Sequence, residues 1–393
     1  MPRPAAVLAL TALLAAGPAL GATPIWITSW GEALDAAAPK FRAQLNNVTL
    51  RQAVHLSAGG HALRLRISNA FGEDVLSLGA AHIGRARPAG AVVAGSDQAL
   101  SFAGKQGVDI PAHGEVLSDP LASMVPAQAE LAVTLYVRAG ESSTAHEWSA
   151  STNYLAPGDQ SAAMALQGAS TRGDRLFLAG IDVTGPQARA SVVALGDSIT
   201  DGVGSTVDGN NRWPDVLGAV LTHAYGDALG VVNVGISGNT ILPGTGPIPG
   251  AVDRLGRDVF IWPNGRYLLV LEGINDCIWI KNGSLTGEAL IAADRRIVAA
   301  AHARGFKVYG ATVMPFGGSW VYGVQGEHAR QILNTFIRHG NLFDAAVDLD
   351  AQLRDPEQPD RLLKAYDSGD HIHPTPAGDA VIAHAFPAAW FKG

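Results

Sequence analysis

Residues 192–202 read VVALGDSITDG, and this stretch decides how the second half of the chain folds. An apolar run stops abruptly at Gly196-Asp197-Ser198, and a polar segment that contains a glycine follows. This pattern predicts a buried strand that ends in a tight turn and presents a serine hydroxyl. Such a turn suits a nucleophile, because the sheet holds the serine in place while the turn exposes its oxygen. Serines in such turns often bind only backbone groups, so the assignment depends on the groups that the rest of the chain supplies.

Strand-like apolar runs alternate with helical stretches from about residue 190 to the C-terminus. The runs are continuously apolar, as is typical of strands that are covered on both faces. The repeated strand–helix order predicts a parallel sheet with helices on both sides. The predicted strands cover 191–195, 231–234, 267–271 and 306–313, and the predicted helices cover 213–224, 287–304 and 327–339.

Three of these strands end in small or polar clusters, at 196–198, 235–239 and 272–276. Because the ends of parallel strands lie together at the edge where ligands bind, we expect the three clusters to converge. Ser198 is the predicted nucleophile. Its own N–H, the N–H of Gly238 and the amide of Asn275 are the predicted donors to a developing oxyanion. Ser237 is interpreted as a turn residue, because the sequence around it lacks the last glycine of a G-x-S-x-G elbow.

A base for the serine is predicted near the C-terminus, where Asp370 precedes His373 by three residues. This spacing lets the carboxylate reach Nδ1 of the imidazole while the other ring nitrogen faces the serine. Asp367 and His371, four residues apart, form a competing pair, and a third interpretation is metal binding by His371 and His373. An H-x-H pair without a further Cys or His cluster is weak evidence for a metal. We therefore favour Asp370 and His373, and we expect no metal and no organic cofactor.

In the first half of the chain, residues 23–185, apolar residues mostly recur with a period of two. Clean alternation at 61–68 and 131–138, with glycine-rich turn signals between such runs, predicts half-buried strands of an all-β, jelly-roll-like sandwich. Trp26 and Trp30 could stack on sugars, but packing at the domain junction is favoured because large aromatic residues mostly lie in cores or interfaces. The pattern changes at 185–189, which predicts a boundary between this domain and a second domain at 190–393.

The composition limits the class of protein. The chain has 393 residues, 47% of them hydrophobic and 16% charged, which predicts two or three well-packed domains. A net charge of −7 without a basic cluster argues against nucleic acid or anionic membrane as the main partner. Cys277 is the single cysteine of the sequence, so an intrachain disulfide is excluded.

Residues 1–22 have the pattern of an export signal. Arg3 is followed by an apolar run over 5–16, and Ala19 and Gly21 are small residues at the positions that a signal peptidase reads. The run is too short to cross a bilayer, which needs roughly 20 residues. We therefore expect a secreted or periplasmic protein without a membrane anchor after removal of the signal. The oligomeric state is left open.

Four motifs in this order resemble the conserved blocks of the GDSL, or SGNH, hydrolases. They are Gly196-Asp197-Ser198, Gly238, Gly273-Ile274-Asn275-Asp276 and Asp370-His371-Ile372-His373-Pro374. The resemblance covers about residues 190–393 and implies a three-layer α/β/α flavodoxin-like domain with serine esterase activity. It implies that Ser198 is the nucleophile, Gly238 and Asn275 are oxyanion donors, His373 is the base and Asp370 orients it. Cys277 departs from the aliphatic residue that is frequent there, and we expect it to pack beside the site.

The β-rich half, with its early tryptophans and Ser68-Asn69-Ala70-Phe71-Gly72, is similar to a secreted branch of this family. Members of that branch are described as arylesterases or acetylesterases, some of them associated with xylan breakdown. The resemblance implies a short-chain ester, such as an acetyl ester on a small molecule or a polysaccharide. A lipase- or lysophospholipase-like enzyme, or an aryl esterase of broad specificity, is the alternative. A non-catalytic carbohydrate-binding protein is the alternative of another class, and the intact set of site residues argues against it.

Overall fold

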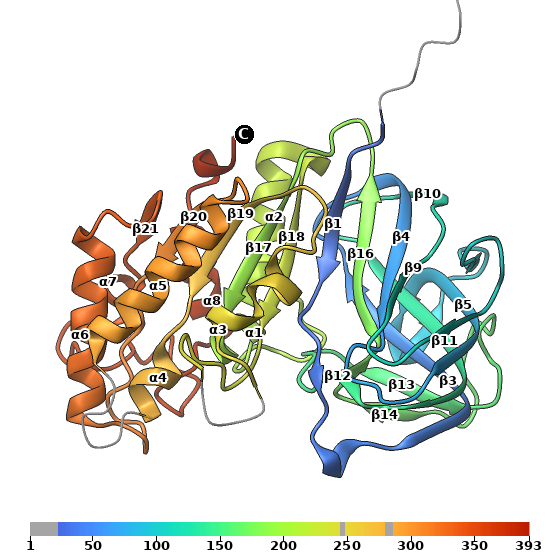
Figure 1. The fold of residues 1–393 in the computed structure, drawn as a ribbon, viewed down its shortest axis with the longest axis horizontal. Coiled ribbons are helices and arrows are strands. Elements are labelled where there is room, and N and C mark those ends of the chain that lie inside the picture. The colour runs from blue at the N-terminus through green and yellow to red at the C-terminus, as the bar shows by residue number, and fades with distance from the viewer. Residues whose placement is uncertain (1–22, 244–247, 280–285, 393) are drawn as a thin grey trace, which may run out of the picture.

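The computed structural model describes residues 23–243, 248–279 and 286–392. The predicted export signal, residues 1–22, lies outside the described residues. A β-rich first half is followed by an α/β half that begins with the strand at Ala190 (Figure 1). No helix in these described ranges is long and apolar enough to cross a membrane.

The first half contains two larger antiparallel sheets and one small sheet. The first sheet has the order β1-β16-β4-β10, with β9 paired to β4. Its strands are β1 (Trp26–Gly31), β4 (Gly60–Ser68), β9 (Glu115–Leu117), β10 (Leu121–Val125) and β16 (Leu178–Thr184). The second sheet has the order β14-β13-β3-β11-β5-β6, with β7 and β8 paired to β5. Its strands are β3 (Gln44–His55), β5 (Leu76–Arg87), β6 (Ala91–Val92), β7 (Gln98–Leu100), β8 (Val108–Ile110), β11 (Glu130–Glu141), β13 (Asn153–Pro157) and β14 (Ser170–Arg172). The small sheet has the order β15-β12-β2: β2 (Asp35–Ala36), β12 (Thr144–His146) and β15 (Arg175–Leu176).

The two larger sheets share one hydrophobic core, to which β4 contributes Leu63, Leu65 and Ile67 as the alternation predicts. The prediction of a half-buried strand is wrong for the first part of β11, where Ala132 and Thr134 on its other face are buried as well. It is confirmed further along, where Tyr136 is half-buried and Arg138 is exposed. The strand lies in the middle of its sheet, and the buried Arg51 of β3 lies across that face and donates from Nε to Thr134 Oγ1 at 2.9 Å.

The second half contains a parallel sheet in the order β18-β17-β19-β20-β21, in which the first strand of the domain stands between the second and the third. The helices α2 and α8 lie on one side of this sheet and α5 and α6 on the other, so the domain has three layers (Figure 1). The strands are β17 (Ala190–Gly196), β18 (Leu229–Gly235), β19 (Gly265–Leu271), β20 (Lys307–Ala311) and β21 (Ala345–Val347). The helices are α1 (Ser198–Asp201), α2 (Trp213–Tyr225), α3 (Ala251–Arg254), α4 (Ile274–Trp279), α5 (Gly287–His302), α6 (Val324–His339), α7 (Leu349–Leu353) and α8 (Pro376–Ala385).

The predicted parallel α/β architecture and the β-rich first half are therefore confirmed. The helix predicted at 287–304 is α5, whose apolar residues Leu290, Ile291 and Ile297 are buried, and Gly305 follows its end with a φ of +78°. The sequence pattern did not predict β21 or α8. Both are short, with three and ten residues, and neither shows the long apolar run or stripe on which the pattern depends.

The two halves are joined along an edge rather than through a flexible linker. β1, at the edge of its antiparallel sheet, lies beside β18, at the edge of the parallel sheet (Figure 1). Thr28 donates its backbone N–H to Ser191 Oγ at 2.8 Å, and Val231 donates its N–H to Ser57 Oγ at 2.8 Å. Trp30 is 5% exposed in this region, with the Arg175 guanidinium 4.7 Å above its ring, which agrees with packing at the junction. Side chains of the first half can therefore reach the α/β half.

Candidate active site

Ser198 lies directly after the buried strand β17, as the first residue of α1. Asp197 begins the helix, because its carboxylate accepts the N–H of Ile199 at 2.9 Å. Gly196 is required for the sharp turn, since a Cβ at this position would lie 1.9 Å from Thr200 Oγ1. Ser198 is 7% exposed, so the turn leaves little of the residue in contact with water.

His373 and Asp370 come from the loop that precedes α8, and His373 lies 175 residues after the serine. His373 Nε2 lies 2.8 Å from Ser198 Oγ, and His373 Nδ1 lies 2.6 Å from Asp370 Oδ2. The other carboxylate oxygen of Asp370 accepts the backbone N–H groups of Ile372 and His373, each at 2.9 Å. The structure thus brings the predicted hydroxyl, imidazole and carboxylate together in the order that serine hydrolysis requires.

The hydrogen bonds at Asp370 determine the tautomer of His373. Burial opposes a charge on Asp370, but the hydrogen bonds from the His373 ring and from the backbone outweigh it, so the pKa of Asp370 is lowered. A carboxylate at this position accepts a hydrogen bond from the protonated Nδ1 of the imidazole, so the proton of the neutral ring stays on Nδ1. Nε2 is then free to accept the proton of Ser198 Oγ.

Gly238 and Asn275 lie at the ends of the two strands that flank β17. Gly238 has a φ of +80°, which favours glycine, and a Cβ there would meet open space. Within the described part of the chain, no acceptor takes the N–H of Gly238. Asn275, 8% exposed, donates one amide hydrogen to Asn239 O at 2.8 Å, and among the described residues no acceptor takes the second. These groups have the chemistry of oxyanion donors.

The side chain and the N–H of Ser237, next to Gly238, are hydrogen-bonded to Asp201. Its Oγ donates to Asp201 Oδ2 at 2.5 Å, and its N–H donates to the same oxygen at 3.0 Å. A hydroxyl held in this way closes a turn, as interpreted from the sequence.

The competing pair, Asp367 and His371, also forms a hydrogen bond, at 2.5 Å between Oδ2 and Nδ1. Both Asp–His pairs of this loop therefore exist, and it is His373 that reaches Ser198. Residues 23–243, 248–279 and 286–392 contain no group of three or more His, Cys, Asp or Glu side chains arranged to hold a metal ion.

Arg254 is a buried residue beneath the site that the motifs did not indicate. Its guanidinium donates to Gly196 O at 2.9 Å, to Val234 O at 2.7 Å and to Asn239 Oδ1 at 2.7 Å. It thereby ties the ends of β17 and β18 to the segment that carries Gly238. No local signal in the sequence could have indicated this role, because its acceptors come from distant parts of the chain.

Buried acids surround this arginine. Glu272 lies 3.6 Å from the Arg254 guanidinium, and burial followed by the nearby Asp197 raises the pKa of Glu272 well above its ordinary value. Burial likewise raises the pKa of Asp197 to about 7. Cys277 is 2% exposed within the core of this half, and burial raises the pKa of its thiol, so it packs as an apolar residue.

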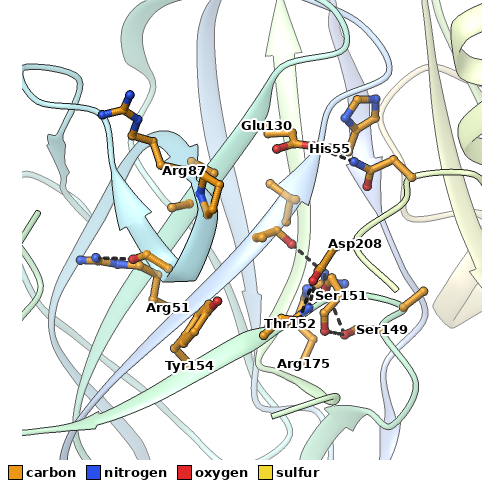
Figure 2. Close-up of a pocket in the computed structure, with 18 of the residues that line it drawn as sticks. Arg51, His55, Arg87, Glu130, Ser149, Ser151, Thr152, Tyr154, Arg175 and Asp208 are labelled. Atoms are coloured by element: carbon orange, nitrogen blue, oxygen red, sulfur yellow. Dashed lines mark hydrogen bonds between the residues drawn. The ribbon is translucent and has the colours of Figure 1, made fainter. Parts of the chain in front are cut away.

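A cavity of about 320 Å³ lies at the junction of the two halves (Figure 2). Arg51 and Tyr154 of the β-rich half line one part of it, and Arg175, Thr152 and Asp208 line another. Asp208 comes from the segment between α1 and α2 and accepts the Thr152 hydroxyl at 2.6 Å. None of the predicted site residues lines this cavity, so it is a feature of the domain junction rather than of the candidate active site.

Comparisons with known proteins point to one family. A model of the GDSL-like Lipase/Acylhydrolase family matches residues 194–381. Among solved structures, the chain is similar to a GDSL-like lipase from Bacteroides thetaiotaomicron, at 19% identity over 51% of this chain and 88% of that one, with a TM-score of 0.36. It is similar to an α/β hydrolase enzyme from the metagenome of Lake Arreo, at 26% identity over 51% and 95%, with a TM-score of 0.37. It is also similar to a carbohydrate acetylesterase from Sinorhizobium meliloti, at 15% identity over 52% and 98%, with a TM-score of 0.40. No curated protein matches the chain.

The segment that matches the family begins within β17 and ends within α8. It therefore contains all five predicted site residues: Ser198, Gly238, Asn275, Asp370 and His373. The resemblance inferred from the four sequence motifs is confirmed by this match. The chain carries, over residues 194–381, a domain of the GDSL-like lipase/acylhydrolase family, and the protein is a carboxylic ester hydrolase.

Proposed function

We propose that the protein is an exported serine esterase that hydrolyses short-chain acyl esters, in particular acetyl esters on a plant polysaccharide such as xylan. The observation that carries the mechanism is the continuous contact from Ser198 Oγ through His373 to Asp370, at 2.8 and 2.6 Å. A serine with an adjacent base and an orienting acid is the arrangement that activates a hydroxyl for attack on a carbonyl.

The reaction proceeds in two halves. Ser198 Oγ attacks the ester carbonyl and passes its proton to His373 Nε2, and the N–H groups of Ser198, Gly238 and Asn275 stabilise the oxyanion. The intermediate collapses, and the alcohol leaves with the proton from His373. Water then attacks the acyl-serine and gives a proton to His373. Collapse of this second intermediate returns that proton to Ser198 Oγ and releases the carboxylic acid.

The position of the catalytic loop supports an ester carried on a large molecule. Asp370 keeps 42% of its side-chain surface exposed, so the loop that bears the base lies at the surface of the domain. An ester on a polymer can approach such a loop without threading into the protein. The preference for acetyl groups rests on the similarity of the β-rich half to the secreted branch of the family.

The proposal is tested with 4-nitrophenyl esters of increasing chain length and with acetate release from acetylated xylan. We expect the acetate ester to be hydrolysed fastest, and we expect Ser198→Ala to lower kcat by roughly 10⁴-fold or more. Wild-type turnover in Ser198→Ala would refute the mechanism. Faster hydrolysis of long acyl chains would favour the lipase-like alternative, and aryl acetate hydrolysis without release from xylan would favour an aryl esterase.

Export is tested separately from activity. The full chain, including residues 1–22, is produced in a bacterial host, and the N-terminus of the protein outside the cytoplasm is sequenced. We expect it to begin shortly after Gly21. A full-length protein retained in the cytoplasm would contradict export and would leave the esterase mechanism unaffected.

A further inference from the structure

One histidine of the β-rich half reaches the catalytic half next to the nucleophile. His146 is the last residue of β12, which lies between β2 and β15 in the small sheet. Its Nε2 lies 2.9 Å from Asp201 Oδ1, and its Nδ1 lies 2.8 Å from Ala33 O. The side chains of His146 and Asp201 are 6% and 2% exposed, so water does not compete for this contact.

The partners of His146 determine its protonation state. A backbone carbonyl and a carboxylate both accept hydrogen bonds, so both ring nitrogens must carry a proton and the ring is an imidazolium. Burial disfavours the charge, but Glu32 and Asp201 outweigh it and raise the pKa of His146 to about 9. An imidazolium with both nitrogens occupied cannot act as a base. Its role is to hold the carboxylate of Asp201.

Asp201 in turn connects two parts of the active site. It is the last residue of α1, the helix that begins with Ser198. Its second oxygen, Oδ2, accepts both the hydroxyl of Ser237, at 2.5 Å, and the N–H of Ser237, at 3.0 Å. These two bonds hold the backbone N–H and the side chain of Ser237, and the next peptide group, which carries the N–H of Gly238, extends from this fixed residue.

We propose that His146 is a positioning residue for the esterase reaction: by holding Asp201 it sets the Ser237–Gly238 turn, so that the N–H of Gly238 points at the oxyanion formed on Ser198. The proposal rests on the function proposed above. An oxyanion donor stabilises the transition state only if it is oriented before the charge develops. The β-rich half is therefore part of the catalytic apparatus, through one side chain, in addition to any role in substrate binding.

The test compares His146→Gln and His146→Ala with Thr222→Val. Thr222 of α2 also joins the halves, through a hydrogen bond from its hydroxyl to Ser57 O at 2.6 Å, but it has no contact with the Ser237–Gly238 turn. With 4-nitrophenyl acetate we expect His146→Ala to lower kcat by about 10- to 100-fold, with KM unchanged within about two-fold. This loss is smaller than the 10²- to 10³-fold that follows deletion of an oxyanion donor. His146→Gln, which can still donate one amide hydrogen to Asp201, should recover part of the loss, and Thr222→Val should keep the wild-type kcat.

Ser237→Ala provides a second variant that leaves the contact between the halves intact. It removes the shortest hydrogen bond that holds the turn, and we expect it to lower kcat without a change in KM. A wild-type kcat in folded His146→Ala, or in Ser237→Ala where the histidine variants do not fold, would overturn the proposal. An equal loss of kcat in Thr222→Val would also overturn it, because general loosening of the junction would then explain the effect.

The failure of the proposed function looks different from the failure of this inference. If the wild-type protein hydrolyses no ester, or if Ser198→Ala keeps its turnover, the esterase mechanism itself is wrong. If the wild type is active and Ser198→Ala is not, a wild-type kcat in the His146 and Ser237 variants refutes the positioning role alone.

Discussion

Two Asp–His pairs, one in the catalytic loop and one at the domain junction, each join a ring nitrogen to a carboxylate oxygen but have different chemistry. The Nδ1–Oδ2 distance in the Asp370–His373 pair is 2.6 Å, and the Nε2–Oδ1 distance in the Asp201–His146 pair is 2.9 Å. The second ring nitrogen of His373 faces the hydroxyl of Ser198, whereas that of His146 faces the carbonyl of Ala33.

The second hydrogen-bond partner of each histidine determines its chemistry. A hydroxyl can donate, so Nε2 of His373 can be the acceptor that a general base needs. A carbonyl can only accept, so both nitrogens of His146 must carry protons and the residue serves as a fixed cation. Burial strengthens the contrast, because Asp370 is 42% exposed at its side chain and Asp201 is 2% exposed.

Replacement of the base is expected to have the largest effect. His373→Gln removes the acceptor for the Ser198 proton, and we expect kcat for 4-nitrophenyl acetate to fall by roughly 10⁴-fold or more with a small change in KM. His146→Gln should lose much less. Equal losses in the two variants would remove the distinction between the pairs.

Loss of the side-chain oxyanion donor is expected to have the next largest effect. Asn275→Ala should lower kcat by about 10²- to 10³-fold, because its hydrogen bond strengthens as charge develops on the substrate oxygen. KM should change little. A rise in KM with an unchanged kcat would show that Asn275 binds the ground state, and the oxyanion would then be left to the N–H groups of Ser198 and Gly238.

The stability of the protein should decrease at alkaline pH through the junction pair. The folded pKa of His146, about 9, lies above its ordinary value of 6.5, so its stabilisation is complete below pH 6.5 and is lost as pH rises through about 9. The acids facing it are Asp201 and Glu32, and the nearby cations Arg175 and Arg212 are paired with Glu32 and Asp215. By linkage, the pKa shift of His146 corresponds to a loss in the free energy of unfolding on the order of 3 kcal/mol or less.

Urea unfolding at pH 6, 8 and 10 measures this loss. The free energy of unfolding of the wild type should fall over this range by more than that of His146→Gln. Thr222→Val should follow the wild type, because it keeps the ionised pair. Parallel pH profiles in all three proteins would show that His146 is not charged in the folded state.

The smallest effect is expected at His371, the neighbour of the catalytic histidine. His371→Gln removes its bond to Asp367, but Asp367 Oδ1 still accepts the N–H groups of Gly369 and residue 371 and so holds the loop. We expect kcat to change by less than about three-fold. A loss comparable to that of His373→Gln would reassign the base to the competing pair.

The sequence indicated the parts of the site that lie at the ends of strands. The apolar run over 191–195 stops at Gly196, and the runs at 231–234 and 267–271 stop beside Gly238 and Asn275, so parallel-sheet topology alone brings these residues to one edge. The spacing of Asp370 and His373 indicated a local pair in the same way. It could not exclude Asp367 and His371, since both pairs form and it is the contact with Ser198 that separates them.

The roles of Arg254 and His146 could not be predicted from the sequence alone. Each acts on partners far away in the chain: Gly196 lies 58 residues before Arg254, and Asp201 lies 55 residues after His146. A hydrophobic period of two or of 3.6 residues predicts which face of a strand or helix is buried. It does not predict which polar group of another segment contacts that face. The motifs around Ser198, Gly238, Asn275 and Asp370–His373 followed from the order of residues because strand ends and short loops are local. The joining of β1 to β18, and with it the contact from His146 through Asp201 to the Gly238 turn, arose only when the two halves packed against each other, because that contact depends on the fit of two surfaces rather than on any one segment.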